Sequence, residues 1–441
     1  MFGVIYGGGG ALLFFLLGVV VWRKFSSIFT LLFPFIYGYF GVFVSCLYLE
    51  LFPSFIFEQG VLSFFNGSSL LLIAVLFVSV VSVIFVFQAL ANVVRVPEVG
   101  RPLLSVKVLI LVIALELLLI IHVFLSGSPL VEVGITKFNF WREKAILESL
   151  SIFNWALYPI LFVVGANGAY FMYVRSRVSW VLSFSVLILA CLYYVSWGNK
   201  FSALLLVVFF YFVPGVVSFR RRYGMAYPVF RRTVLLGLVF AFTVASLVLL
   251  QYERFQSRGL DAGEQLIERV LVLQGHVWWG SVNEVLSIGP DYDQIAKEFG
   301  AILSSESEGP VGMRYIMESL APEYLYLSYL ESGVEFTAGY PAILLLVFSF
   351  WGVLLFSVFW WGFYGLFLFY LARLIFLGSR VRLFFSAYLY MASLAWFQHG
   401  SLSGFVNWKF FVVCLFLFFL EAVLSLRGLK EVSVSQGGCD A

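Results

Sequence analysis

Long apolar segments recur along almost the whole chain, and they constrain the fold more than any other feature of the sequence. A segment of about 18 or more apolar residues can cross the hydrocarbon core of a bilayer as a helix. Backbone polar groups in lipid must bond within their own segment, which selects helices, and the alternation typical of barrel strands is absent. Only 12% of the residues are charged, whereas roughly 25% are charged in soluble domains. The sequence therefore predicts an all-α polytopic membrane protein.

We expect about 11 transmembrane helices from the number of apolar segments. The expected spans are 3–22, 28–52, 70–91, 104–125, 151–173, 178–197, 201–219, 233–251, 340–372, 383–399 and 404–426. Over 340–372 a single tilted or broken helix fits the distribution of charges, whereas two short spans would invert the rest of the topology. Four parts follow from these spans: an N-terminal transmembrane bundle (1–251), a large loop (252–339), C-terminal transmembrane helices (340–426) and a polar tail (427–441).

Positive charges alternate between successive connecting segments. Most of the 27 lysines and arginines fall in one set of short segments, of which 219–232 (FRRRYGMAYPVFRR) is the clearest. Short loops rich in Lys and Arg remain on the cytoplasmic side of a membrane. The N-terminus and the loops 126–150 and 252–339 are therefore predicted outside the cytoplasm, and the tail inside it.

The loop 252–339 carries 14 acidic and five basic residues. Apolar residues at helical spacing over 266–277 predict an amphipathic helix. Arg269 and His276 are seven residues apart, so they would share one face if this helix continues through Gly275. This arrangement would place a base about 10 Å along the helix from a phosphate ligand.

Further along this loop, Trp278 and Trp279 suit either an interfacial anchor or a platform for stacking a sugar. A second short helix over 312–322 is expected to end near Pro322. The pair Asp291 and Asp293 forms a DxD pattern, which in some glycosyltransferases holds a metal. Because a Gly-Pro precedes it and a helical pattern follows, we interpret it as the start of a helix.

Basic residues predicted on the outer side could form one pocket for a lipid-linked diphosphate, which needs fixed cationic donors near the headgroup plane. These candidates are Lys200, Arg254, Arg258, Arg269, Arg314, Lys409 and Arg142. Solvated charges, or lysines that snorkel to the interface, are the structural alternative. The candidates for a catalytic base are His276 or His399, with Glu335 as the carboxylate alternative. Each histidine could instead only hydrogen-bond the sugar or a neighbouring backbone group.

Glu116 and His122 lie in one expected span. A carboxylate inside the membrane is a functional candidate, but a protonated or hydrogen-bonded packing role is favoured slightly. No GxxxxGK[ST], HExxH or GxSxG pattern supports ATP-driven transport or the common hydrolases. The four cysteines contain no CxxC pair that would indicate a zinc site or a disulfide.

Three stretches carry a resemblance to a known family. They are 198–202 (GNKFS), 268–280 (ERVLVLQGHVWWG) and 336–341 (FTAGYP). Together with the many spans and the large loop late in the chain, they resemble the Wzy-type O-antigen or oligosaccharide repeat-unit polymerases. Arg269, followed by ten residues and then Gly280, is similar to the Arg-x10-Gly pattern of that family.

The resemblance implies a GT-C-like glycosyltransferase architecture and metal-independent glycosyl transfer at the periplasmic face of the bacterial inner membrane. The donor would be the growing chain on undecaprenyl diphosphate, and the acceptor a new lipid-linked repeat unit. No cofactor and no nucleic acid are implied; a Wzx-type flippase and a Wzz-type chain-length regulator are the implied partners. An O-antigen ligase, a lipid-linked oligosaccharide flippase or transporter, and a structural scaffold remain alternatives. A flippase should show paired halves and a charged central cavity, neither of which the sequence indicates.

Overall fold

The computed structural model describes most of the chain, and within the described residues the fold is helical apart from one small hairpin. The described residues are 26–94, 104–129, 140–141, 144–173, 176–198, 201–223, 268, 271–303, 309–332, 335–336, 339–377, 379–400, 406 and 408–436. The hairpin pairs β1 (Phe55–Ile56) with β2 (Val61–Leu62) in antiparallel fashion.

The helices fall into a long and a short class. The long helices are α2 (Ser26–Leu51), α3 (Ser68–Val93), α4 (Val106–Leu125), α6 (Phe153–Tyr173), α7 (Arg177–Ser196), α8 (Phe201–Tyr223), α15 (Gly339–Leu377), α16 (Arg380–His399) and α18 (Trp408–Gln436). The short elements are η1 (Glu148–Ile152), α11 (His276–Ser287), α12 (Asp293–Leu303), α13 (Met313–Leu320) and α14 (Glu323–Ser332). We call α11 to α14 the cap.

Six helical segments are long and apolar enough to cross a membrane. They are Ile28–Leu51, Ser68–Val93, Val106–Leu125, Glu148–Gly168, Arg177–Ser196 and Tyr340–Leu377. Apolar side chains cover the outer surfaces of these helices as well as their packed surfaces, which is typical of helices in lipid. The expectation of an α-helical protein with several membrane-spanning segments is confirmed.

Of the remaining expected spans, three are helices in the structure and two lie outside the described residues. The span expected at 201–219 is the helix α8, whose apolar part, Ala203–Ser218, is shorter than the six segments above. Those expected at 383–399 and 404–426 are the helices α16 and α18. The spans expected at 3–22 and 233–251 lie outside the described residues. The count of 11 therefore stays a prediction.

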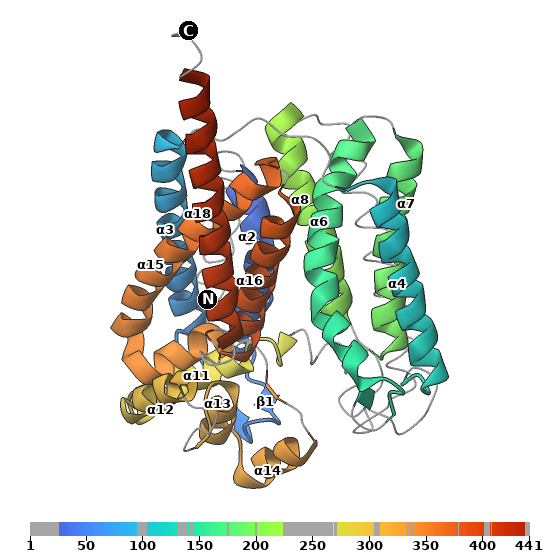
Figure 1. Ribbon diagram of the computed structural model, residues 1–441. Coiled ribbons are helices and arrows are strands. Elements are labelled where there is room, and N and C mark those ends of the chain that lie inside the picture. Colours follow the sequence, from blue (N-terminus) through green and yellow to red (C-terminus); the bar gives the residue numbers. More distant parts are fainter. Residues whose placement is uncertain are drawn as a thin grey trace.

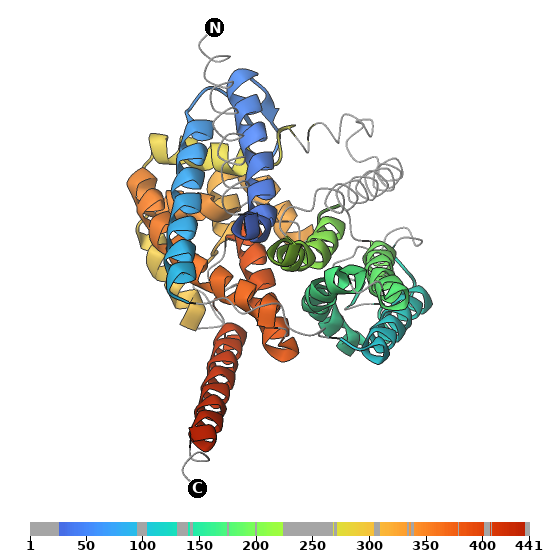
Figure 2. The same cartoon turned by 90° about the horizontal axis from the view of Figure 1, so that it is seen from above.

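The long helices form two groups, which Figure 1 shows side by side. One group consists of α4, α6 and α7, and the other of α2, α3, α15, α16 and α18. Figure 2 shows α8 between them, and α8 packs on both α6 and α2. The contact of α6 with α8 is close because Gly165 has no side chain. A Cβ there would lie 1.9 Å from the carbonyl oxygen of Tyr211, the kind of approach that small residues allow between membrane helices.

Helix α15 is broken near its start. Ser349 has φ 66° and ψ −175°, a conformation that interrupts the helix. Before the break, residues 341–347 are buried beside the cap, and the Leu346 carbonyl oxygen accepts a hydrogen bond of 2.8 Å from the Asp291 amide. The piece after the break packs along α3. The helix over 340–372 is therefore broken, and that it crosses the membrane once stays a prediction.

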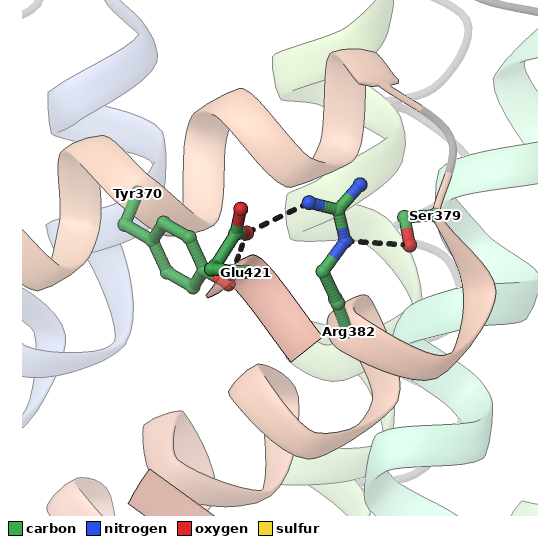
Figure 3. Close-up of polar contacts among 4 residues, drawn as sticks. All are labelled: Tyr370, Ser379, Arg382 and Glu421. Atoms are coloured by element: carbon green, nitrogen blue, oxygen red, sulfur yellow. Dashed lines mark hydrogen bonds and ion pairs between the residues drawn. The ribbon is translucent and has the colours of Figure 1, made fainter. Parts of the chain in front are cut away.

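Helix α18 is attached to its neighbours by a polar contact, shown in Figure 3. The Arg382 Nη1 atom donates to Glu421 Oε1 at 2.7 Å, and the Tyr370 hydroxyl donates to the same oxygen at 2.9 Å. Arg382 Nε donates to Ser379 Oγ at 2.9 Å. These bonds join α15, α16 and α18. The cap lies at the opposite end of the bundle from the C-terminal end of α18 (Figure 1).

Candidate active site at the cap

Helix α11 joins the cap to the membrane helices through two buried tryptophans. The Trp278 ring nitrogen donates to the Ser68 carbonyl oxygen at 2.8 Å, and that of Trp279 donates to the Phe64 carbonyl oxygen at 2.9 Å. Both rings are almost fully buried. Neither ring can therefore stack on a sugar or reach the membrane interface, so both interpretations from the sequence are wrong. These residues hold α11 against the start of α3.

Two glycines allow α11 to approach the hairpin side of the protein. A Cβ on Gly275 would lie 2.7 Å from the Cys46 amide nitrogen, and one on Gly280 would lie 2.4 Å from Gln59 Nε2. Gly275 also donates its amide to Ser45 Oγ at 2.8 Å. Gly280, the glycine of the Arg-x10-Gly pattern, thus has a packing reason to be glycine.

The helix expected over 266–277 does not continue through Gly275. The chain turns over 272–275, and α11 begins at His276 with Gly275 before it. The condition under which Arg269 and His276 would share one helix face is therefore not met. Arg269 itself lies outside the described residues.

His276 is buried, with 3% of its surface exposed. Its Nδ1 lies 2.9 Å from the Leu273 carbonyl oxygen, which can only accept, so Nδ1 carries the proton and Nε2 has a free lone pair in the neutral ring. Burial lowers the pKa of His276 to about 4, since removal from water disfavours the charged imidazolium. At neutral pH the ring is therefore uncharged. The edge-to-face contact with Phe336, 4.8 Å between ring centroids, covers it.

Arg314 and Glu335 form an ion pair at the surface of the cap. Arg314 Nε lies 3.3 Å from Glu335 Oε1, and the two side chains are 61% and 35% exposed. Arg314 points outward because Met313, Ile316 and Met317 form the buried face of α13. The pair is exposed enough for an anion from solution to replace Glu335 as the partner of Arg314.

The segment 335–336 brings three candidate residues together. Glu335 contacts Arg314, and the next residue, Phe336, contacts His276. Two contacts fix Phe336. Its amide donates to Met317 Sδ at 3.4 Å, and its ring makes an edge-to-face contact with Tyr329. The result is an exposed carboxylate and guanidinium above a buried neutral imidazole.

The other candidate residues are not brought into this group by the described structure. His399 is the last residue of α16, and its side chain is not described. The end of α16 does lie against the start of α15, because Trp396 and Phe397 pack on Tyr340. Lys409 is exposed at the start of α18. Residues Arg142, Lys200, Arg254 and Arg258, like Arg269, lie outside the described residues, so the shared basic pocket stays a prediction.

Asp291 begins a helix, as its sequence context predicted. Its Oδ1 accepts hydrogen bonds from the amides of Asp293 (3.1 Å) and Gln294 (3.4 Å) at the start of α12, which is how a capping aspartate acts. Its Oδ2 accepts from the Tyr315 hydroxyl at 3.0 Å. Among the described residues, no group of three or more His, Cys, Asp or Glu side chains could hold a metal ion. The expected end of the second short helix near Pro322 is also confirmed, because α13 ends at Leu320.

Glu116 and His122 on α4 lie away from the cap. Glu116 is fully buried, and neither carboxyl oxygen has a hydrogen-bond partner among the described residues. His122 Nε2 accepts the Leu147 amide at 3.0 Å, and its ring stacks on Trp141. His122 therefore fixes the loop that follows α4, which supports its structural interpretation.

Sequence reasoning did not single out Phe336 and Gln59, although both contact His276. Phe336 appeared only within a quoted stretch, although it links His276 to the Arg314–Glu335 pair. Gln59 donates to the His276 carbonyl oxygen at 2.8 Å across a separation of 217 residues. No local pattern indicates such a contact; the only signal is a polar pair, Glu58 and Gln59, within an otherwise apolar connection between two spans.

Comparison with known proteins gives a match to a family model over part of the chain. Residues 306–414 match the model of a family described as a family of unknown function, DUF6418. The match extends from the end of α12 to the start of α18 and includes Arg314, Glu335, His399 and Lys409. No curated protein and no solved structure matches the chain.

Proposed function

We propose that the protein is a membrane-embedded glycosyltransferase that polymerises undecaprenyl-diphosphate-linked oligosaccharide units, as an O-antigen polymerase does. The observation that carries the proposal is the exposed Arg314–Glu335 pair on a helical cap at one end of an apolar bundle. A guanidinium can bind a diphosphate, and a carboxylate can accept a proton from a sugar hydroxyl. The bundle and cap would keep the lipid-linked substrates beside the membrane.

In the proposed reaction the acceptor hydroxyl oxygen attacks the anomeric carbon of the donor sugar. The bond between that carbon and the diphosphate oxygen breaks, and the diphosphate leaves with the electron pair. The hydroxyl proton passes to a base. Because the leaving group is already a stable anion, cationic donors can stabilise its charge without a metal. Arg314 takes this role, and a bound diphosphate would draw it away from Glu335.

Of the candidate bases, Glu335 fits the reaction better than His276. The Glu335 carboxylate is partly exposed, so a substrate can reach it. His276 is buried under Phe336, which keeps a sugar hydroxyl away from its ring. We assign His276 the role of supporting Phe336, and thereby the position of Glu335. His399 remains a second candidate for the base.

A deletion strain tests the proposal. The gene is removed and surface polysaccharide is run on a gel. Loss of the ladder with retention of a band for the core plus one repeat unit supports a polymerase. Loss of every polysaccharide band would contradict it and indicate a ligase or a flippase. Complementation with Arg314→Lys should restore less polymer than the unsubstituted gene, because an ammonium cannot make the bidentate contact of a guanidinium.

Purified protein and lipid-linked units test the metal requirement. Polymerisation should proceed in excess EDTA, because the proposed leaving-group stabilisation uses cationic side chains. Complete loss of activity with EDTA, restored by Mg²⁺ or Mn²⁺, would contradict the metal-independent mechanism. The DxD aspartates, Asp291 and Asp293, would then have to be reconsidered as ligands, despite the hydrogen bonds that Asp291 makes at the start of α12.

A further inference from the structure

The connection between α2 and α3 forms a small ordered element that contains the β1–β2 hairpin. In its hairpin, Phe55 pairs with Leu62 and Ile56 with Val61. Gly60, with φ 66°, allows the turn. The Ser63 amide and the Ser54 carbonyl oxygen bond at 2.9 Å, and Ser63 Oγ donates to the Leu49 carbonyl oxygen at 2.8 Å. These bonds hold the hairpin to the end of α2.

One side of the connection faces the protein. Ile56, Glu58, Gln59 and Ser63 are all buried. Gln59 holds the backbone of His276, as described above, and Asn66 Nδ2 donates to the Trp279 carbonyl oxygen at 3.0 Å. The hairpin and α11 are thus fixed relative to each other.

The other side of the connection exposes large apolar groups. The cross-strand pair Phe55 and Leu62 is 61% and 60% exposed. The further exposed apolar side chains are Phe52, Phe57, Val61, Phe64 and Phe65. Glu58 is the only charged residue between the two helices, and its side chain is buried. The exposed surface therefore carries no charge, although it belongs to a connection and not to a span.

We propose that this apolar face is inserted among the acyl chains of the membrane leaflet on the cap side. The hairpin is continuous with two segments that can cross a membrane, since Ile28–Leu51 ends just before it and Ser68–Val93 begins just after it. It therefore lies close to the membrane surface. Acyl chains match an uncharged surface of phenylalanine and leucine, and an isolated patch of this kind marks an interaction site.

The backbone limits how deep the hairpin can go. Each strand of a two-stranded hairpin has an unpaired edge, and unpaired backbone groups are not tolerated in the hydrocarbon core. The strands therefore lie at the headgroup level, with the phenylalanine rings directed into the acyl region. Because Gln59 and Asn66 bind α11, the hairpin sets the height of the cap above the membrane. This inference does not depend on the reaction that the protein catalyses.

Depth-dependent quenching of a fluorescent label tests the proposal. Phe55→Cys and Leu62→Cys are each labelled with a nitrobenzoxadiazole group in the full-length protein. The matched control is Glu331→Cys, at an exposed position on α14. The proteins are reconstituted in vesicles of phosphatidylcholine and phosphatidylglycerol, and the labelled unsubstituted protein provides the background from its own cysteines. Thermal melting shows which variants are folded, and two hairpin positions guard against one misfolded variant.

Lipids with a nitroxide near the glycerol end of the acyl chain should remove most of the fluorescence at positions 55 and 62. Nitroxides near the terminal methyl group should remove less, and aqueous iodide should have little effect. At position 331 iodide should quench and the lipids should not. Iodide quenching at 55 and 62 without lipid quenching would overturn the proposal. Protection of these positions only after addition of undecaprenyl phosphate would also overturn it, because the face would then bind a substrate tail.

Discussion

The inner face of α11 and the outer face of α13 belong to the same cap but serve different purposes. On the inner face, His276, Trp278 and Trp279 are buried and direct polar atoms to backbone carbonyl groups. On the outer face, the exposed Arg314 pairs with the partly exposed Glu335. The inner face has a structural role, because its buried side chains donate to backbone carbonyl oxygens that a ligand cannot replace. On the outer face, an anionic ligand could replace Glu335 as the partner of Arg314 at small cost.

The comparison also shows why residue type alone misleads. His276 and Trp278–Trp279 are the residue types expected at a sugar site, yet they are packed under Phe336 and against the membrane helices. Arg314 and Glu335 are ordinary surface residue types, yet they have the exposure that the proposed reaction requires. If this division is right, substitutions on the two faces will separate activity from stability.

The largest effect should come from Glu335. Replacing it by Gln removes the proposed proton acceptor, so turnover of purified lipid-linked units should fall by about 10² to 10⁴-fold, the usual contribution of general acid–base catalysis. The melting temperature should not change. Glu331→Gln, also at an exposed carboxylate, is the matched control and should retain activity. A Glu335→Gln enzyme within tenfold of the original would remove Glu335 from the mechanism and leave His399 to be tested.

Trp278→Ala should instead lower stability. Truncation of a buried tryptophan costs about 3–5 kcal/mol through lost burial and the remaining cavity, and here the Ser68 carbonyl oxygen also loses its donor. Thermal unfolding in detergent, followed by loss of the monodisperse gel-filtration peak, measures the effect. Trp351→Ala, at a side chain 81% exposed, should change the free energy of unfolding by less than about 0.5 kcal/mol. Equal effects of the two substitutions would contradict the structural role of Trp278.

His276 should make the cap sensitive to acid. Its pKa is about 4 in the folded protein and near 6.5 in an unfolded chain, so unfolding takes up a proton between these values. Its contribution to stability is complete above pH 6.5 and decreases as the pH falls toward 4. The loss is roughly 1.4 kcal/mol for each pH unit within that window. His276→Gln does not titrate, so melting curves at pH 7.5 and 5 should differ less for the variant. An unchanged pH dependence would show that His276 is not buried and neutral.

The smallest effect should be that of the exposed ion pair on stability. Arg314→Ala should change the free energy of unfolding by less than about 1 kcal/mol, because exposed ion pairs gain little over hydrated charges. Polymer formation should nevertheless fall, since the proposed diphosphate ligand is lost. Chemical or thermal unfolding and the polymerisation assay are measured on the same preparation. A large loss of stability would show that Arg314 has a structural role like the buried residues of α11, which would contradict the contrast between the two faces.

Local physical patterns in the chain predicted much of the secondary structure. The apolar segments corresponding to α2, α3, α4, α6 and α7 were expected, and Asp291 starts a helix as its Gly-Pro-Asp context indicated. Local patterns failed where a turn or a burial depends on distant residues. The turn before His276 is supported by Ser45, more than 200 residues earlier, and both tryptophans are buried by the residues near the start of α3.

The sequence by itself determined that the chain forms apolar helices, because the length and composition of each segment are local properties that a bilayer selects. It also determined which residues carry charge. Only the tertiary structure decided which of these residues can meet a substrate. His276 and Glu335 are both possible bases by residue type, and their difference lies in Phe336, which covers the histidine and holds the glutamate beside Arg314. Burial and contact between distant segments arise when the helices pack, and no single segment contains that information.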